Sequence, residues 1–389
     1  MERIQYLQHR LQRLEDSGDL RCLPHGVNDG REVIGTAGGR MLNLSSNDYL
    51  GLSNNDDLYA GFWETCSARD LQFSASSSRL LTGNYPAHQR LESLLAQRFG
   101  TEAALVFNSG YHANTGILPA ICDARTLILA DKLVHASLID GIRLSDARAV
   151  RFRHNDWEQL ERLVGQYSRE YERIVVVVES IYSMDGDTAD LARLVGLRRS
   201  YPNVWLYVDE AHAFGVYGAN GLGYAEVCGC MGEIDFLVGT FGKTIASVGA
   251  YVACRKIVRD YLVNRMRTFI FTTALPPLNI AWTSFVVERL EQFEDRRLAL
   301  ARVSACLRGG LEKKGYTCTS SSHIVPWVVG SSEDAVQRAE LLQKKGFYVL
   351  PVRPPTVPQG AARLRFSLTA DMQRADIDRL LTLIPSRTL

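Results

Sequence analysis

The stretch Ile174-Val175-Val176-Val177-Val178 is the clearest fold signal in this sequence. An unbroken run of β-branched apolar residues predicts a strand that is buried on both faces, since a strand with one wet face would alternate apolar and polar side chains. Strands of this kind are typical of parallel sheets covered by helices. We therefore expect an α/β sheet with helical crossovers around this segment.

Similar short runs lie on either side of this strand, with longer helical stretches between them. They cover residues 105–107, 126–129, 150–152, 204–208, 236–238 and 250–252. Together with 174–178 they predict a mostly parallel, seven-stranded sheet in a large α/β domain. After Pro276-Pro277 the pattern changes to a long helical segment over 278–311, three β-rich runs and a terminal helix near 375–383, which predict a smaller α+β domain.

The amino-terminal residues predict an amphipathic helix over 1–16. Ile4, Leu7, Leu11 and Leu14 recur at spacings of three and four, which places them on one helix face. We expect residues 1–45 to pack with the small domain, 46–285 to form the large domain, and 286–389 to form the small α+β domain.

Composition limits the classes of function. The chain has 389 residues and a formal net charge of +1, so neither a nucleic-acid partner nor a membrane partner is expected. Its start is polar and its apolar runs are short, which predicts a cytoplasmic protein without a secretion signal. Cys228-Gly229-Cys230 is the one close pair among the cysteines and no nearby His completes a zinc pattern, so we predict reduced thiols and no metal site.

Two polar motifs stand at the ends of predicted strands. Gly239-Thr240-Phe241-Gly242-Lys243-Thr244 follows 236–238, and Asp209-Glu210-Ala211-His212 follows 204–208. Strand ends border the ligand crevice of α/β sheets. An amine for a Schiff base, an acid for a pyridine nitrogen and a polar group for a phenolic oxygen are what pyridoxal phosphate (PLP) requires. The alternative, a nucleotide-binding P-loop, needs glycine at the position of Leu237 and is disfavoured.

These motifs resemble those of the α-oxoamine synthases, a family of fold-type I PLP-dependent transferases. Leu44-Ser45-Ser46-Asn47-Asp48-Tyr49-Leu50-Gly51-Leu52 resembles the family's amino-terminal signature, and Glu179-Ser180-Ile181-Tyr182-Ser183-Met184-Asp185-Gly186-Asp187 resembles its central signature. The similarity runs over nearly the whole chain. The resemblance implies a large PLP-binding domain with a smaller α+β domain.

The resemblance also implies catalytic roles. Lys243 would carry the cofactor as a Schiff base and then act as the base that removes the α-proton. Asp209 would keep the pyridine nitrogen protonated, and His212 would hydrogen-bond the phenolic oxygen. His135 matches the imidazole that stacks on the cofactor ring. His112 and His154 have no such match, and we interpret them as structural.

For the cofactor phosphate, the resemblance implies Gly110 and Tyr111, at the start of a helix that follows 105–107, where backbone N–H groups bind anions. Hydroxyl groups would come from Ser183, Thr240 and Thr273. In the family the segment that corresponds to Thr272-Thr273 reaches the phosphate of the neighbouring subunit. This implies a homodimer.

Substrate carboxylates are expected to meet arginine side chains. Arg353 resembles the amino-acid carboxylate clamp, with Thr356 on the same loop, and Arg21 resembles a residue near the far end of the acyl substrate. The segment Arg353-Pro354-Pro355-Thr356-Val357-Pro358, followed by Ala362-Arg363-Leu364-Arg365, resembles the branch of the family that condenses L-alanine with a pimeloyl thioester in biotin biosynthesis.

The sequence departs from the family pattern at three places near the expected site. Residues 74–78 carry serines where glycines are frequent, Ala213-Phe214 replaces a small polar pair, and Ala246 stands where glycine is common. The expected reaction is decarboxylative, releasing CO2 and the thiol carrier, which is coenzyme A or an acyl carrier protein. The alternatives are glycine or serine with a different acyl-CoA, or a non-catalytic binding module. Retention of Lys243 and Asp209 argues against the module.

Overall fold

The computed structural model describes residues 2–36 and 38–387, and these form two compact units. The large unit contains Asn55–Ser183 and Asp187–Arg297. The small unit takes its residues from Met1–Asn54, Met184–Gly186 and Leu298–Leu389. Each unit has its own sheet structure and its own buried core.

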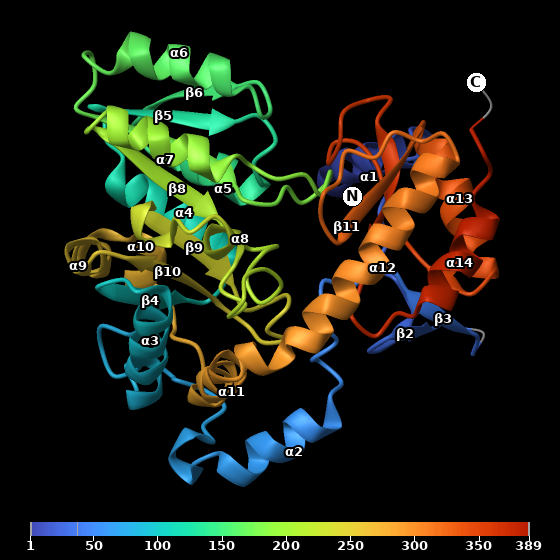
Figure 1. Cartoon of the computed structure of the whole chain (residues 1–389), viewed down its shortest axis with the longest axis horizontal. Helices are drawn as coiled ribbons and strands as arrows, with labels where there is room; N and C mark the ends of the chain where they lie inside the picture. The colour runs from blue at the N-terminus through green and yellow to red at the C-terminus, as the bar shows by residue number, and fades with distance from the viewer. Residues whose placement is uncertain (1, 37, 388–389) are drawn as a thin grey trace. The chain divides into compact units, whose positions relative to one another are not determined.

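A seven-stranded sheet forms the centre of the large unit (Figure 1), as predicted from the sequence. Five neighbouring strands are parallel, whereas β10 runs antiparallel to both β9 and β4. The order across the sheet is β4 (Ala103–Phe107), β10 (Ala250–Cys254), β9 (Phe236–Thr240), β8 (Val204–Asp209), β7 (Arg173–Glu179), β5 (Thr126–Asp131) and β6 (Arg148–Phe152).

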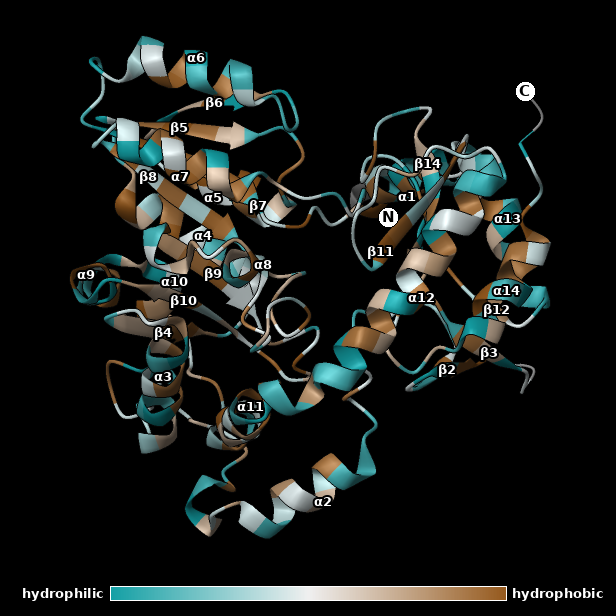
Figure 2. Ribbon diagram, viewed as in Figure 1, coloured by the Kyte–Doolittle hydropathy of each residue, from teal (hydrophilic) through white to brown (hydrophobic). Residues whose placement is uncertain are grey.

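The interior strands are apolar along their length because both of their faces are buried. All five residues of Ile174–Val178 have no exposed surface, and the same holds for Leu127–Ala130 of β5. Figure 2 shows the central strands largely in brown, whereas the helices carry both brown and teal positions. Burial of this apolar surface is the main stabilising term for the sheet.

Helices connect the strands of the large unit and cover them. Helix α4 packs against α5 and against β4, β9 and β10, and α7 packs against β8. The helices are α2 (Asp56–Thr65), α3 (Pro86–Phe99), α4 (Gly110–Ile121), α5 (Ala136–Leu144), α6 (Trp157–Tyr167), α7 (Leu191–Ser200), α8 (Tyr224–Val227), α9 (Lys256–Arg265), α10 (Arg267–Ile270) and α11 (Pro277–Glu288). Short 3₁₀ turns lie at Ala68–Asp70 and Met231–Glu233.

The single long helix predicted over 278–311 is wrong in one respect, because the chain leaves the α-helix at Arg289. Helix α11 ends at Glu288, a 3₁₀ turn covers Leu290–Phe293, and α12 begins at Glu294 and ends at Lys313. Arg289 has φ −101° and ψ 4°, and its Nη1 donates to the Phe285 carbonyl oxygen. The break buries the side chains of Leu290 and Phe293.

The small unit combines two small sheets with helices. One sheet has the order β1 (Val27–Asp29), β2 (Glu32–Ile34), β3 (Arg40–Asn43) and β12 (Phe347–Tyr348); the other has the order β11 (Ile324–Gly330), β14 (Ala362–Ser367) and β13 (Pro351–Val352). The helices here are α1 (Glu2–Asp16), α13 (Ser332–Lys344), α14 (Arg374–Leu383) and most of α12.

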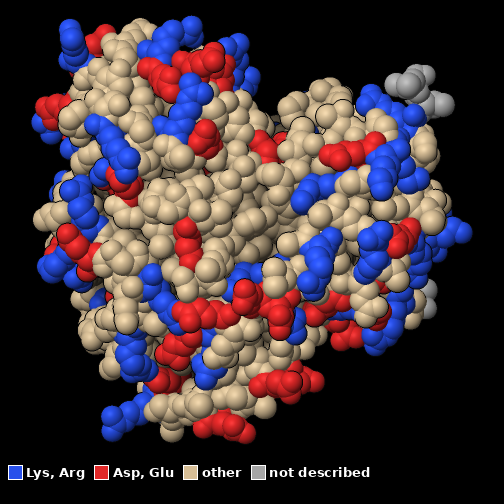
Figure 3. Space-filling model, in the orientation of Figure 1, with Lys and Arg blue, Asp and Glu red and all other residues tan. Residues whose placement is uncertain are grey.

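Helix α1 confirms the predicted amphipathic element, and its apolar face is exposed in the single chain. Ile4, Leu7, Leu11 and Leu14 are 63%, 57%, 54% and 44% exposed. None of the helices within residues 2–36 and 38–387 is long and apolar enough to span a bilayer. Acidic and basic side chains are interspersed on the face drawn in Figure 3.

Candidate active site

A cavity of about 200 Å³ lies in the large unit where several strands of the central sheet end. Glu179, Asp209 and Thr240 are the last residues of β7, β8 and β9. Because these strands are neighbours and run parallel, the three residues lie at the same edge of the sheet, where the carboxyl ends of the strands meet. The lining residues are Gly110, Tyr111, Asn114, His135, Ser137, Glu179, Asp209, Ala211, His212, Thr240, Gly242 and Lys243.

Lys243 and His212 meet in this cavity. The Nζ atom of Lys243 lies 3.0 Å from Nε2 of His212. The turn that carries the lysine is held by two backbone hydrogen bonds, from Ala246 N to the Lys243 carbonyl oxygen and from Phe241 N to the Gly249 carbonyl oxygen. The amine is therefore presented to the cavity from a fixed backbone.

Asp209 is held by two donors on different segments. Nδ2 of Asn114 donates to its Oδ2 at 2.8 Å, and the backbone N–H of Ala211 donates to its Oδ1 at 2.9 Å. Asn114 is itself fixed, since the hydroxyl of Tyr207 donates to its Oδ1 at 2.6 Å. A carboxylate oriented in this way can accept a further hydrogen bond from a ligand in the cavity.

Comparison with known proteins identifies the family of this arrangement. The family model "Aminotransferase class I and II" matches residues 39–384. The 8-amino-7-oxononanoate synthase of Haemophilus ducreyi is 51% identical over 385 residues, covering 97% of this chain and 99% of that protein.

Among solved structures, a serine palmitoyltransferase from S. paucimobilis with PLP and myriocin bound has a TM-score of 0.88 at 31% identity, covering 98% of this chain and 96% of that one. The 8-amino-7-oxononanoate synthase from Francisella tularensis has a TM-score of 0.74 at 26% identity, covering 88% and 96%. The chain belongs to the α-oxoamine synthases. It is therefore a PLP-dependent acyltransferase of fold type I.

The residues of the cavity fit this cofactor. Oε1 of Glu179 has no hydrogen-bond partner within the described part of the chain, although its side chain is only 2% exposed. Burial, and next the charge of Asp209, raise the pKa of Glu179 to about 8. An unpaired buried oxygen beside an amine and a carboxylate is expected of a site that a polar ligand completes.

His135 caps helix α5 of this α-oxoamine synthase and belongs to the same hydrogen-bond network as Asp209. Its Nδ1 lies 2.8 Å from Oγ of Ser137 and accepts from the Ser137 backbone N–H at 3.2 Å. Nδ2 of Asn114 also donates to Oγ of Ser137 at 2.9 Å. Burial lowers the pKa of His135, which favours the neutral ring. One asparagine thus orients both the carboxylate and the segment that carries the imidazole.

The expected phosphate ligands divide into two groups. Gly110 and Tyr111 begin α4 and line the cavity with Thr240, where the first N–H groups of the helix are available to an anion. Ser183 and Thr273 are not among the residues that line it. Ser183 is 8% exposed, and the carbonyl oxygen of Thr273 accepts from Nδ2 of Asn108 at 2.7 Å. Their roles stay predictions.

The predicted substrate residues form a cluster within the small unit. Nη2 of Arg21 donates to Oγ1 of Thr356 at 3.0 Å, and the Arg353 guanidinium donates to the carbonyl oxygens of Gly18 and Leu20. These three residues are far apart in sequence, so the fold of the small unit brings them together. Their roles toward a substrate also stay predictions.

Sequence reasoning missed Asn114 and Glu179. Asn114 is 1% exposed on α4, between Ala113 and Ile117, which are both fully buried. A polar residue inside an apolar helix stripe is the signal that could have indicated it. Glu179 opens the central signature, and its position directly after a fully buried strand could have indicated it.

Proposed function

We propose that this enzyme condenses L-alanine with a pimeloyl thioester, with loss of CO2, and gives 8-amino-7-oxononanoate and the free thiol carrier in biotin biosynthesis. The observation that carries the proposal is the meeting of the Lys243 amine, the His212 imidazole and the Asp209 carboxylate in one cavity of a chain that is 51% identical to an 8-amino-7-oxononanoate synthase. PLP supplies an electron sink for the carbanion that forms at the α-carbon of the amino acid.

The contacts of the cavity residues support a separate role for each of them. Lys243 would hold the cofactor aldehyde through Nζ and would afterwards hold the proton removed from the α-carbon. Asp209, already oriented by Asn114, would accept a hydrogen bond from the pyridine N–H at its carboxylate. His212, 3.0 Å from Nζ, would orient the amine and hydrogen-bond the phenolic oxygen. His135 would pack against the cofactor ring.

We infer further that the enzyme works as a cytoplasmic homodimer in which Thr273 of one copy contacts the phosphate bound by Gly110, Tyr111, Ser183 and Thr240 of the other. Phe271, two residues before Thr273, is 72% exposed in the single chain, as expected for a segment that a second copy covers. All eight cysteines are free thiols, which suits a reducing compartment.

In the small unit, Arg353 and Thr356 would bind the alanine carboxylate and Arg21 would meet the distal carboxylate of the pimeloyl group. The contact between Arg21 and Thr356 supports a shared role, because one loop then carries or touches all three side chains. A planar guanidinium suits both tasks, since it binds a carboxylate with two parallel hydrogen bonds.

The direct test is a thiol-release assay on the PLP-loaded enzyme with alanine, glycine or serine and with pimeloyl-CoA or pimeloyl-acyl carrier protein. Alanine should support turnover and the product should have the mass of 8-amino-7-oxononanoate. Palmitoyl-CoA with serine is the necessary comparison, since a serine palmitoyltransferase matches the fold at a TM-score of 0.88. Turnover with glycine or serine, and none with alanine, would overturn the proposal.

A further inference from the structure

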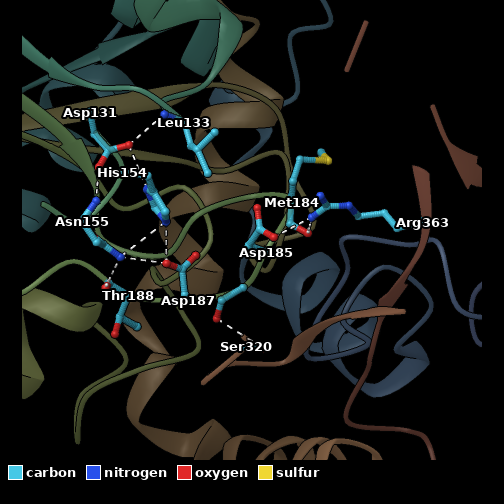
Figure 4. Close-up of polar contacts among 11 residues, drawn as sticks. Asp131, Leu133, His154, Asn155, Met184, Asp185, Asp187, Thr188, Ser320 and Arg363 are labelled. Atoms are coloured by element: carbon cyan, nitrogen blue, oxygen red, sulfur yellow. Dashed lines mark hydrogen bonds and ion pairs between the residues drawn. The ribbon is translucent and has the colours of Figure 1, made fainter. Parts of the chain in front are cut away.

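A charged cluster lies beside the cavity at the same edge of the sheet, and no functional role was predicted for it. It consists of His154, Asp131, Asp187 and Asn155 (Figure 4). His154 and Asn155 follow β6, Asp131 is the last residue of β5, and Asp187 follows the loop after β7. Nδ1 of His154 lies 2.9 Å from Oδ1 of Asp131, and Nε2 lies 2.7 Å from Oδ2 of Asp187.

The other hydrogen bonds of the cluster fix the protonation state of the ring. Asp131 also accepts from the backbone N–H groups of Leu133, at 2.7 Å, and of Asn155, at 2.9 Å. Oδ2 of Asp187 accepts from Nδ2 of Asn155 at 2.8 Å. Both carboxylates are therefore acceptors, so both ring nitrogens of His154 must donate, which only the imidazolium can do.

The charge on this ring is also favoured electrostatically. Burial opposes it, but the hydrogen bonds and charges of Asp131 and Asp187 outweigh burial and raise the pKa of His154 to about 10. The Tyr182 ring packs against the imidazole in a T-shaped arrangement, with centroids 4.4 Å apart and planes at 87°. The side chain of Asp131 is fully buried, so loss of the cation would leave an uncompensated charge inside the protein.

Asn155 holds a backbone conformation that serves the same cluster. Its φ is 53°, in the left-handed region that asparagine tolerates better than most residues. In this conformation its backbone N–H reaches Asp131 while Nδ2 reaches Asp187 and, at 3.2 Å, the carbonyl oxygen of Thr188. Asn155 thus donates hydrogen bonds to the same two carboxylates that contact the imidazolium, those of Asp131 and Asp187.

The cluster contacts two segments, one that leads into the cavity lining and one that carries Ser183, a predicted phosphate ligand. On one side, the turn after Asp131 is held at Leu133 and leads directly to His135, which lines the cavity. On the other side, Tyr182 packs on His154 and directly precedes Ser183.

The loop that carries Ser183 is closed at its base. Ile181 pairs with Thr188, and the Tyr182 N–H donates to the Asp187 carbonyl oxygen at 3.0 Å.

We propose that His154, as an imidazolium bound to Asp131 and Asp187, is a positioning residue of the PLP site. It fixes the positions of the turn that leads to His135 and of the loop that carries Ser183. The inference rests on the cofactor and not on the identity of the acyl donor or the amino acid. It gives the enzyme a partly buried cation at neutral pH where the sequence suggested only a structural histidine.

The protonation state is tested first on the unmodified PLP-loaded enzyme. Nitrogen-15 NMR of the histidine side chains should show one ring with two N–H signals that persist well above pH ~6.5, the ordinary pKa of a histidine. Assignment uses His154→Gln or, if that variant does not fold, Asp187→Asn, in which the ring should lose its proton at lower pH. A neutral His154 ring at neutral pH would overturn the proposal.

The positioning role is tested by cofactor binding, which requires no acyl substrate. His154→Gln should weaken PLP binding by about tenfold or more and change the circular dichroism of the cofactor band near ~420 nm, because the ring contacts shift. Asp187→Asn keeps the contact with Asp131 and should show a smaller change in both. The matched control is His9→Gln, on the exposed face of α1.

Wild-type PLP affinity and circular dichroism in a folded His154→Gln variant would overturn the positioning role. If that variant does not fold, Asp187→Asn decides, and an unchanged affinity and spectrum in it would overturn the role equally. Neither result bears on whether alanine and a pimeloyl thioester are the substrates, so the two proposals fail separately.

Discussion

Nζ of Lys243 lies 3.0 Å from Nε2 of His212, so the amine that we propose to bind the cofactor already has a hydrogen-bond partner in the cavity. The two side chains come from the loops that follow β9 and β8, which are parallel neighbours. The strand order of the sheet therefore sets this distance, and substitutions at either position should change the chemistry more than the stability.

Replacing His212 by alanine removes the partner of the Lys243 amine. We expect kcat for 8-amino-7-oxononanoate formation to fall about 10²-fold, because the amine and the phenolic oxygen lose a fixed hydrogen-bonding group. Steady-state kinetics with alanine and pimeloyl-CoA measure this, with His9→Ala as the control. A kcat within twofold of wild type would show that His212 does not act on the reacting atoms.

Replacing Asn114 by alanine leaves two buried groups without their partner, Oδ2 of Asp209 and the Tyr207 hydroxyl. The free energy of unfolding should decrease by about 2 kcal/mol, and PLP affinity should fall with it. Urea unfolding of the cofactor-free protein and a PLP titration measure the two effects. Exposed Asn264→Ala should change neither, and a wild-type PLP affinity in Asn114→Ala would contradict the role given to the network.

Ala246 holds a φ of 50°, and the resemblance to the family had indicated glycine as the common residue there. Alanine is strained in the left-handed region, whereas glycine is not, although glycine costs more entropy on folding. Ala246→Gly should therefore raise the free energy of unfolding by about 0.5–1 kcal/mol, measured by urea unfolding. Ala253→Gly, within β10, should lower it. Destabilisation by both variants would mean that the turn at 246 carries no strain.

The His154 cluster predicts a pH dependence of stability. The pKa of His154 is raised from 6.5 to about 10 in the folded state, so its contribution is complete below pH 6.5 and is lost as the pH rises through 10. The groups that face the ring are Asp131, Asp187 and Tyr182.

Unfolding in urea across that range should show wild type more stable than His154→Gln by about 2–3 kcal/mol at neutral pH, with the difference shrinking as the pH approaches 10. A constant difference across the range would contradict a titrating imidazolium at this position.

The strands of the large sheet were predictable because a strand that is buried on both faces has an unbroken run of apolar residues in the sequence. Ile174–Val178 can be little other than an interior strand, and the polar motifs at Asp209 and Lys243 mark where neighbouring strands end. The break at Arg289 was not predictable from periodicity, since Leu290 and Phe293 continue an apolar helical pattern while the backbone leaves it.

The site was only partly predictable for a different reason. Lys243, Asp209 and His212 lie in short motifs, but Asn114, which hydrogen-bonds to Asp209, comes from α4. His154, which we propose to hold the turn before His135, follows β6. A lone polar residue in an apolar stretch is most often structural, so its contact with a reacting group emerges only once the strands are placed side by side. A polar residue in an apolar helix stripe indicates a buried hydrogen bond, but the sequence does not identify the partner.

The central claim is that the cofactor binds covalently to Lys243. Borohydride reduction of the PLP-loaded enzyme followed by peptide mass spectrometry tests it most directly. We predict the phosphopyridoxyl group on Lys243 alone, with no modification of the same peptide in Lys243→Ala. A phosphopyridoxyl group on another lysine, or none on any, would contradict the account.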